Sequence, residues 1–190
     1  MSLVEFERRE IERLLGLLDE RLTQQGARGS IYVVGGAAIA VTVRDERRTV
    51  DIDAVVSDRI VLEEARRLAD DEGIPRNWLN ENAKPWIPPR PPAAVAPPDK
   101  VGLTIHWAPL EHLLAMKLVA MRPQDAPDIV ALAQRLGLGT NATEYADLVE
   151  RVYDAEDTLQ QLLNVPHDDV RTEAFRRGEI AAGLVRRESL

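Results

Sequence analysis

The chain has 190 residues, of which 45% are apolar and 29% charged, so it can bury a hydrophobic core and belongs to the globular class. It contains no cysteine, which excludes disulfide bonds, thiolate zinc sites and cysteine nucleophiles. Its formal net charge of −8 argues against binding nucleic acid over the whole surface, although a local basic cleft is still compatible with it. Without an apolar run long enough for a membrane span or a signal segment, we expect a cytoplasmic protein with no membrane partner.

The first third of the chain alternates between two kinds of hydrophobic pattern. Apolar residues at helical spacing predict amphipathic helices, and short runs rich in β-branched residues are typical of buried strands. Helices are expected at residues 3–24, 37–41 and 60–71, and strands at residues 31–34 and 50–56. Glycines end the first helix and the third, because glycine readily adopts the backbone conformation that closes a helix.

The remaining two thirds begin with a proline-rich stretch and are then mostly helical. Seven prolines between Pro85 and Pro98 predict an extended surface connection, since proline fits neither a helix interior nor a central strand. A third strand is expected at residues 101–107, and helices at residues 109–121, 125–136, 141–153 and 155–164. We assign no element to the charged tail from His167. The predicted fold class is α/β (α+β): a small mixed sheet flanked by helices over residues 1–108, with a helical C-terminal part over residues 109–190.

Two aspartates interrupt the second predicted strand. Side chains two residues apart on a strand point to the same face, so the carboxylates of Asp51 and Asp53 are expected side by side. Adjacent carboxylates are costly to bury, and a divalent cation removes that cost; Mg²⁺ is the natural one, because it is held by one or two carboxylates plus substrate phosphates. The alternative is a strand end open to water, or pairing with arginines of the preceding loop (Arg44, Arg47 and Arg48).

A diglycine, Gly35-Gly36, lies between the first strand and the helix that follows it. Without side chains, the backbone N–H groups can approach a phosphate closely at the positive end of that helix. By itself a diglycine indicates only a tight turn. Because a strand with two aspartates follows within twenty residues, the combination predicts a phosphate cradle beside a metal site, as phosphoryl and nucleotidyl transfer require.

Lys117 lies within an almost wholly apolar run from Leu113 to Met121. A bare cation cannot be buried there, so the ammonium group must reach water or meet an anion. Two alternatives stay open, namely an anion in the active site and a structural ion pair with Asp125 or Asp128.

Three segments resemble the nucleotidyltransferase-fold proteins of the AbiEii toxin group, over roughly residues 30 to 140. They are Gly35-Gly36 followed by Arg47-x-Thr49-x-Asp51-x-Asp53, then Asn77-Trp78-Leu79-Asn80, and finally Leu113 to Arg122 with Asp125 and Asp128. The resemblance implies an Mg²⁺-dependent enzyme that moves a nucleoside monophosphate from a nucleoside triphosphate to an acceptor hydroxyl. It also implies the toxin side of a toxin–antitoxin pair, with tRNA, another RNA or a protein as acceptor and a cognate antitoxin as partner.

The resemblance assigns roles to individual residues. Catalysis is expected from Asp51, Asp53 and Lys117, with the two aspartates as metal ligands and the lysine on a nucleotide phosphate. Nucleotide binding is expected from the following set: Gly35, Gly36, Arg47, Thr49, Arg122 and Asp128.

The chain departs from the pattern of active nucleotidyltransferases at one point. These enzymes commonly carry a third carboxylate on a later strand, but residues 101–107 contain no acid, only His106. Two further functions therefore stay open. One is a non-catalytic relative that binds a nucleotide or a protein, and the other is an antibiotic adenylyltransferase with the same site and a different acceptor.

Overall fold

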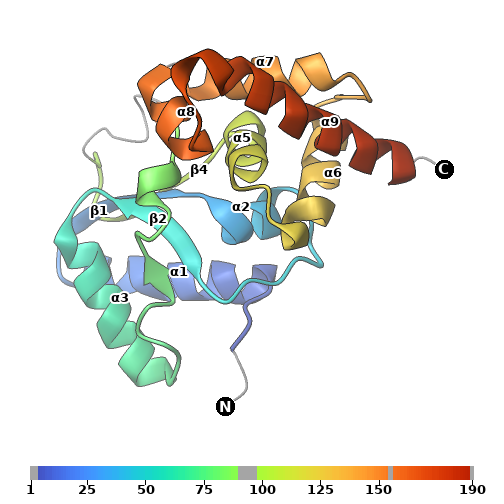
Figure 1. Cartoon of the computed structure of the whole chain (residues 1–190). Helices are drawn as coiled ribbons and strands as arrows, with labels where there is room; N and C mark the ends of the chain where they lie inside the picture. Colours follow the sequence, from blue (N-terminus) through green and yellow to red (C-terminus); the bar gives the residue numbers. More distant parts are fainter. Residues whose placement is uncertain (1–3, 90–97, 154–155, 189–190) are drawn as a thin grey trace. The chain divides into compact units, whose positions relative to one another are not determined.

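The computed structural model describes residues 4–89, 98–153 and 156–188, shown in Figure 1. The chain divides into two compact units. The first, here the sheet unit, comprises Met1–Pro85 and Arg90–Ala108; the second, the helical unit, comprises Trp86–Pro89 and Pro109–Leu190. None of the described helices combines the length and apolar character needed to cross a bilayer.

The sheet unit has a four-stranded mixed sheet with the order β3-β2-β1-β4. Strand β1 pairs antiparallel with β2 and parallel with β4, while β2 pairs parallel with β3. Its elements are α1 (Arg8–Gln24), β1 (Arg28–Val33), α2 (Gly35–Thr42), β2 (Ile52–Val56), α3 (Arg59–Glu72), β3 (Leu79–Asn80) and β4 (Gly102–Trp107). The 3-10 turn η1 (Lys84–Trp86) falls where the chain passes from one unit to the other. The predicted fold class, a small mixed sheet flanked by helices with a helical C-terminal part, is confirmed.

Helices α1 and α3 cover one face of this sheet (Figure 1), since α1 packs on β4, α3 packs on β1, β2 and β3, and the two helices touch each other. Helix α1 buries one apolar stripe completely, formed by Ile11, Leu14, Leu15, Leu18 and Leu22. At the N-terminus of α3, the side chain of Asp58 accepts a hydrogen bond from the N–H of Ile60, and Gly73 ends the helix in the left-handed conformation.

In the described residues, the helical unit contains the helices and 3-10 turns α5 (Leu110–Ala120), η2 (Pro123–Asp125), α6 (Ala126–Arg135), α7 (Ala142–Tyr153), α8 (Glu156–Leu163), η3 (His167–Asp169) and α9 (Val170–Glu188). Helix α5 packs against α6, α7 and α9, and α7 packs most extensively against α9. Arg177 of α9 donates hydrogen bonds to the carbonyl oxygens of Leu118 and Val119, in the last turn of α5. These carbonyl groups have no hydrogen-bond partner within their own helix, so the guanidinium group of Arg177 supplies the missing donors at the C-terminus of α5.

Several predicted boundaries differ from the observed ones, and strand β1 already starts at Arg28, three residues before the predicted start. Helix α1 starts at Arg8 rather than residue 3, because the backbone of Phe6 pairs with that of Thr49 in an antiparallel bridge. Strand β2 starts at Ile52 rather than residue 50, and Val50 is exposed. Helix α2 already begins at Gly35, two residues before the predicted start. Leu3 and residues 90–97 of the predicted proline connection lie outside the described part of the chain.

One strand and one α-helix were not predicted at all. Strand β3 has only two residues and exists through its pairing with β2. Helix α9 occupies the tail to which no element was assigned. Four of its six buried residues are alanine or glycine, and the larger Phe175 and Ile180 are exposed, so no stripe of large apolar residues marks the helix in the sequence.

Candidate functional site

The sheet unit places the two aspartates around a buried isoleucine at the start of β2. Ile52 is fully buried, whereas Asp51, directly before the strand, and Asp53, its second residue, are both half-buried. This alternation is the one expected for a strand, so the two carboxylates face away from the side on which Ile52 enters the core.

Gly35, the first residue of α2, lies directly against Asp53. The N–H of Val34 donates to the backbone carbonyl of Asp53 at 2.9 Å, which brings the end of β1 onto β2. A Cβ atom on Gly35 would lie 3.2 Å from Oδ2 of Asp53, and Gly35 has a φ of 66°, a conformation that side chains other than glycine disfavour. The absent side chain therefore lets the N-terminus of α2 approach the carboxylate.

Gly36 lies against the loop that precedes the aspartates. A Cβ atom on Gly36 would lie 2.8 Å from Oγ1 of Thr49 and 3.3 Å from a terminal nitrogen of Arg47. The hydroxyl of Thr49 donates to the backbone carbonyl of Asp51 at 3.0 Å. The first N–H groups of a helix have no partner within it, so α2 presents N–H donors next to an arginine, a threonine and a carboxylate.

Asn80, for which no role was predicted, joins this group. Its Nδ2 donates to Oδ2 of Asp51 at 3.0 Å, and in the β2–β3 register it lies opposite Asp53. Trp78 positions the strand: it is fully buried, its indole N–H donates to the carbonyl of Ala65, and its own carbonyl accepts from the N–H of Ile52. The strand beside the aspartates thus offers an amide, not a third carboxylate. Residues 77–80 are one of the segments that resemble the AbiEii group, and this resemblance was the one sign in the sequence that Asn80 could belong to the site.

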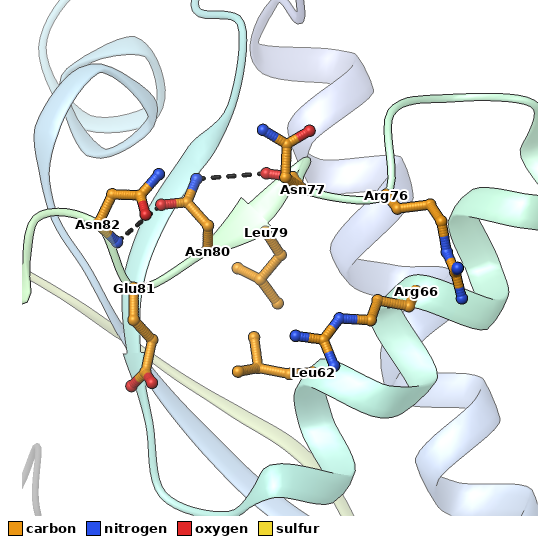
Figure 2. A pocket seen from close by; sticks show the side chains of 8 residues that line it. All are labelled: Leu62, Arg66, Arg76, Asn77, Leu79, Asn80, Glu81 and Asn82. Carbon is orange, nitrogen blue, oxygen red and sulfur yellow. Dashed lines mark hydrogen bonds between the residues drawn. The ribbon is translucent and has the colours of Figure 1, made fainter.

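A hollow of about 470 Å³ lies next to Asn80, between α3 and β3 (Figure 2). Its lining combines basic, amide, acidic and apolar side chains, which are Leu62, Arg66, Arg76, Asn77, Leu79, Asn80, Glu81 and Asn82. Asn80 therefore serves both as a wall of this pocket and as the hydrogen-bond donor to Asp51.

In the helical unit, Lys117 forms a buried cluster with two aspartates. Its Nζ lies 2.6 Å from Oδ1 of Asp125 and 3.0 Å from Oδ2 of Asp128, and the lysine is only 5% exposed. Arg122 donates from Nε to Asp125 at 2.9 Å. Burial by itself would raise the pKa of Asp125, but the hydrogen bonds from Arg122 and Lys117 outweigh it and hold the pKa below its ordinary value.

The nine predicted site residues thus form two groups. Six lie together in the sheet unit: Gly35, Gly36, Arg47, Thr49, Asp51 and Asp53. The other three, Lys117, Arg122 and Asp128, lie together with Asp125 in the helical unit. The ion pair that the sequence left open for Lys117 is present with both aspartates, while its contact with a nucleotide phosphate stays a prediction.

The sheet-unit group fits Mg²⁺ by the chemistry of its donors. Asp51 and Asp53 offer hard oxygen ligands, and Mg²⁺ commonly binds one or two carboxylates and takes its other ligands from phosphates and water. Within residues 4–89, 98–153 and 156–188, no three His, Asp or Glu side chains are grouped so that they could hold a metal ion. A cation at Asp51 and Asp53 would therefore take its remaining ligands from water and from the phosphates of a nucleotide.

A comparison with protein families decides the classification. The model of a family described as "Nucleotidyltransferase of unknown function (DUF6036)" matches residues 11–167. The chain belongs to this nucleotidyltransferase family. No curated protein and no solved structure matches the chain significantly.

The match to the DUF6036 family covers all nine predicted site residues and Asn80. It spans the sheet unit from within α1 and continues through the helical unit as far as η3. Family membership supports a nucleotide as the substrate, and it agrees with the mixed α/β architecture of the sheet unit.

Proposed function

We propose that this chain is an Mg²⁺-dependent nucleotidyltransferase. The observation that carries the proposal is the contact of the glycine-rich N-terminus of α2 with Asp53, since it places phosphate-binding N–H groups beside a carboxylate pair. A triphosphate bound there would meet both positive backbone donors and a metal held by Asp51 and Asp53. Electrostatic stabilisation of this kind is the main catalytic device of phosphoryl and nucleotidyl transfer.

In the proposed reaction, the oxygen of an acceptor hydroxyl bonds to the α-phosphorus of the nucleoside triphosphate. The bond from that phosphorus to the β-phosphate oxygen breaks, pyrophosphate leaves, and the hydroxyl proton passes to water. Mg²⁺ at Asp51 and Asp53 supplies Lewis-acid stabilisation of the phosphate charge. The N–H groups of Gly35 and Gly36 and the side chains of Arg47 and Thr49 bind the triphosphate.

The residues of the helical unit have a smaller part in this proposal. Lys117 has three N–H donors, and Asp125 and Asp128 each engage the ammonium group. The predicted contact of Lys117 with a phosphate of the nucleotide is part of the proposal. Arg122 and Asp128 assist by holding Asp125 and Lys117 in place.

The resemblance to the AbiEii group supports a toxin of a toxin–antitoxin pair, with tRNA or another RNA as acceptor and an antitoxin protein as partner. A second candidate is a nucleotide-binding relative without turnover. What favours it is the absence of an acid from residues 101–107, together with Asn80, which places an amide rather than a carboxylate beside the pair. The two candidates differ in one respect, since only the enzyme transfers a nucleotide.

Label transfer tests the proposal. The protein is incubated with Mg²⁺, each of the four α-labelled nucleoside triphosphates and total RNA, and label on RNA or protein is measured. We expect label on the acceptor with the wild type and none with Asp51→Asn/Asp53→Asn. The matched control is Asp45→Asn/Glu46→Gln, which removes the same two charges from exposed positions of the preceding loop and should keep activity. Equal labelling by the wild type and the Asp51/Asp53 variant would refute the proposed site.

A further inference from the structure

Helix α9 leaves one of its faces open. Residues at intervals of three and four lie on one stripe of a helix, and here that stripe consists of Thr172, Arg176, Glu179, Gly183 and Arg186. Gly183 is half-buried and the other four are exposed. The opposite side of α9 is buried and packs most extensively on α7 (Figure 1). Another molecule can therefore reach the stripe.

The two glycines of α9 have different surroundings. A Cβ atom on Gly178 would collide with the carbonyl oxygen of Ala142, so the close approach of α7 explains this glycine. A Cβ atom on Gly183 would meet nothing within 4 Å. Glycine destabilises a helix interior relative to alanine, and no contact within the described residues accounts for that cost at Gly183. The close approach of a second helix at the stripe would account for it.

Opposite charges mark the two ends of this helix. Arg186 and Arg187 are exposed in its last turn and have no ion-pair partner among the residues that the structure describes. Asp168 and Asp169 are exposed in η3, which runs directly into α9. Within the described chain, Asp169 has no ion-pair partner, and Asp168 meets only the neighbouring His167, at 3.6 Å. The arginines and the aspartates are thus available to a partner.

Two large apolar side chains lie exposed between these ends, beside the stripe. Phe175 is 39% and Ile180 is 38% exposed. Charges of these signs at the ends of a helix stabilise its dipole, which explains the aspartates and the arginines within a single copy. The dipole does not explain the apolar side chains. An apposed helix would remove part of both from water.

We propose that α9 pairs in antiparallel orientation with α9 of a second copy of this chain. When the two-fold axis lies at the level of residues 177 and 178, the C-terminal end of each helix lies beside the N-terminal end of the other. Arg186 and Arg187 of one copy then lie next to Asp168 and Asp169 of the second copy. Because the contact is symmetric, these attractions occur twice.

The same register also fits the middle of the stripe. Arg176, which holds Glu173 of its own helix at 2.7 Å, lies opposite Glu179 of the second copy. Thr172 lies opposite Gly183, so the two backbones can come close where the side chain is missing. The register thus uses both the charges and the unexplained glycine.

A second copy fits this face better than a partner of one charge. A polyanion such as RNA would be attracted by the arginines but repelled by the aspartates at the other end, and a polycation would meet the reverse. The face requires an acidic end and a basic end in the opposite order, and α9 presents this order when it is turned end for end. One helix pair is a small interface, so we expect a weak dimer with a Kd on the order of 100 µM.

Sedimentation velocity of the full chain, at concentrations from about 10 µM to about 1 mM, tests this pairing. We expect the wild type to dimerise as its concentration rises, and to do so less in about 1 M salt, because salt screens exposed charges. Arg186→Glu/Arg187→Glu and Asp168→Arg/Asp169→Arg should each weaken dimerisation about tenfold or more, since like charges then meet. An equal mixture of the two variants should dimerise again, because each variant supplies the charges that the other has lost.

The matched control is Arg9→Glu/Arg59→Glu, which reverses two exposed arginines of the sheet unit, changes the net charge equally and should dimerise like the wild type. Gly183→Leu is a second test: its side chain has open space in one copy, so the variant should fold, but it separates the paired helices and should weaken dimerisation. Circular dichroism checks that each variant is folded.

The proposal is overturned if the wild type stays monomeric up to about 1 mM, if the control weakens dimerisation as much as the α9 variants do, or if the mixture of folded variants stays monomeric. RNA binding by a monomeric wild type that Arg186→Glu/Arg187→Glu abolishes would also overturn it and would assign the basic end to a polyanion. No nucleotide takes part in the sedimentation experiment, so a failure of the pairing is distinct from a failure of the proposed function.

Discussion

The side-chain amide of Asn80 donates a 3.0 Å hydrogen bond to Oδ2 of Asp51, from a two-residue strand that a buried tryptophan fixes against α3. This bond takes up one lone pair of the carboxylate and sets its orientation. Replacing a group that orients a metal-binding side chain typically lowers metal affinity or activity about 10–100-fold. The position of Asn80 therefore makes it a positioning residue for the proposed metal site.

Replacing Asn80 by alanine should leave Asp51 without its orienting donor. We expect Asn80→Ala to weaken Mg²⁺-dependent nucleotide binding by about 10–100-fold while the protein stays folded, as measured by calorimetry and circular dichroism. Asn77→Ala is the control, because Asn77 contributes only its backbone carbonyl to Asn80. If the two variants bind nucleotide equally well, Asn80 does not position the site.

Gly36 should not tolerate a side chain if the N-terminus of α2 binds phosphate. The added methyl group of Gly36→Ala would lie 2.8 Å from Oγ1 of Thr49, so the loop that carries Thr49 must move. We expect nucleotide affinity to fall about tenfold or more, since close backbone approach is lost.

The control for this variant is Gly16→Ala, where a methyl group within α1 meets no atom within 4 Å. It should raise the free energy of unfolding by about 0.5–1 kcal/mol and leave nucleotide binding unchanged. Thermal unfolding and calorimetry measure both quantities. Unchanged affinity in Gly36→Ala would argue against a phosphate at this helix terminus.

Local patterns in the sequence predicted most of the fold. The apolar stripe of α1, the two aspartates around a buried isoleucine and the glycine stop after α3 all depend on neighbouring residues, and all were predicted correctly. The buried environment of Lys117 was also visible from the apolar run around it, together with its two candidate partners.

The unpredicted parts depend on long-range contacts. Strand β3 depends on two contacts between distant residues: Trp78 is anchored on α3, and Asn80 pairs with Asp53 of β2. A strand of two residues is too short to show a hydrophobic period in the sequence. Helix α9 packs closely through small residues: a Cβ atom on Gly178 would lie 2.3 Å from the carbonyl oxygen of Ala142 in α7. In a sequence, such a helix differs little from a charged tail, because its buried face is mostly alanine and glycine, with Val170 and Val185 as the only larger residues.

Removing the buried lysine should destabilise the helical unit. Lys117→Met removes the buried cation from Asp128 and leaves Asp125 with Arg122 alone, and breaking a buried ion pair in this way costs about 3–5 kcal/mol of unfolding free energy. Urea denaturation measures the change, with the exposed Lys100→Met as control.

A compensated variant tells the two roles of Lys117 apart. Lys117→Met/Asp125→Asn/Asp128→Asn has no buried charge left to compensate, so it should recover much of the lost stability. If it folds and still binds nucleotide like the wild type, the predicted phosphate contact of Lys117 is wrong and the lysine is structural. If Lys117 contacts a phosphate as proposed, the folded triple variant binds nucleotide more weakly than the wild type.

The lowered pKa of Asp125 predicts a dependence of stability on pH. Because the pKa in the folded state lies below the ordinary value of 3.8, the carboxylate contributes stability that is fully present above that pH and is lost as the pH falls through the folded-state pKa. The difference in unfolding free energy between the wild type and Asp125→Asn should therefore be largest near neutral pH and shrink in acid.

Urea denaturation at neutral pH and at successively lower pH below 4 measures this difference. Asp168→Asn is the control, since the side chain of Asp168 is fully exposed and its replacement should matter little at any pH. A difference for Asp125→Asn that stays constant down to the acid limit would contradict the ion-pair assignment.

The central claim is that Asp51 and Asp53 hold a metal-bound nucleotide at the N-terminus of α2. Calorimetric titration with each of the four nucleoside triphosphates, with and without Mg²⁺, tests it most directly. We predict that at least one triphosphate binds at millimolar concentration or below only when Mg²⁺ is present. We also predict that Asp51→Asn/Asp53→Asn loses this binding while Asp45→Asn/Glu46→Gln keeps it. Binding that is absent for all four triphosphates, or equal in the two double variants, would contradict the claim.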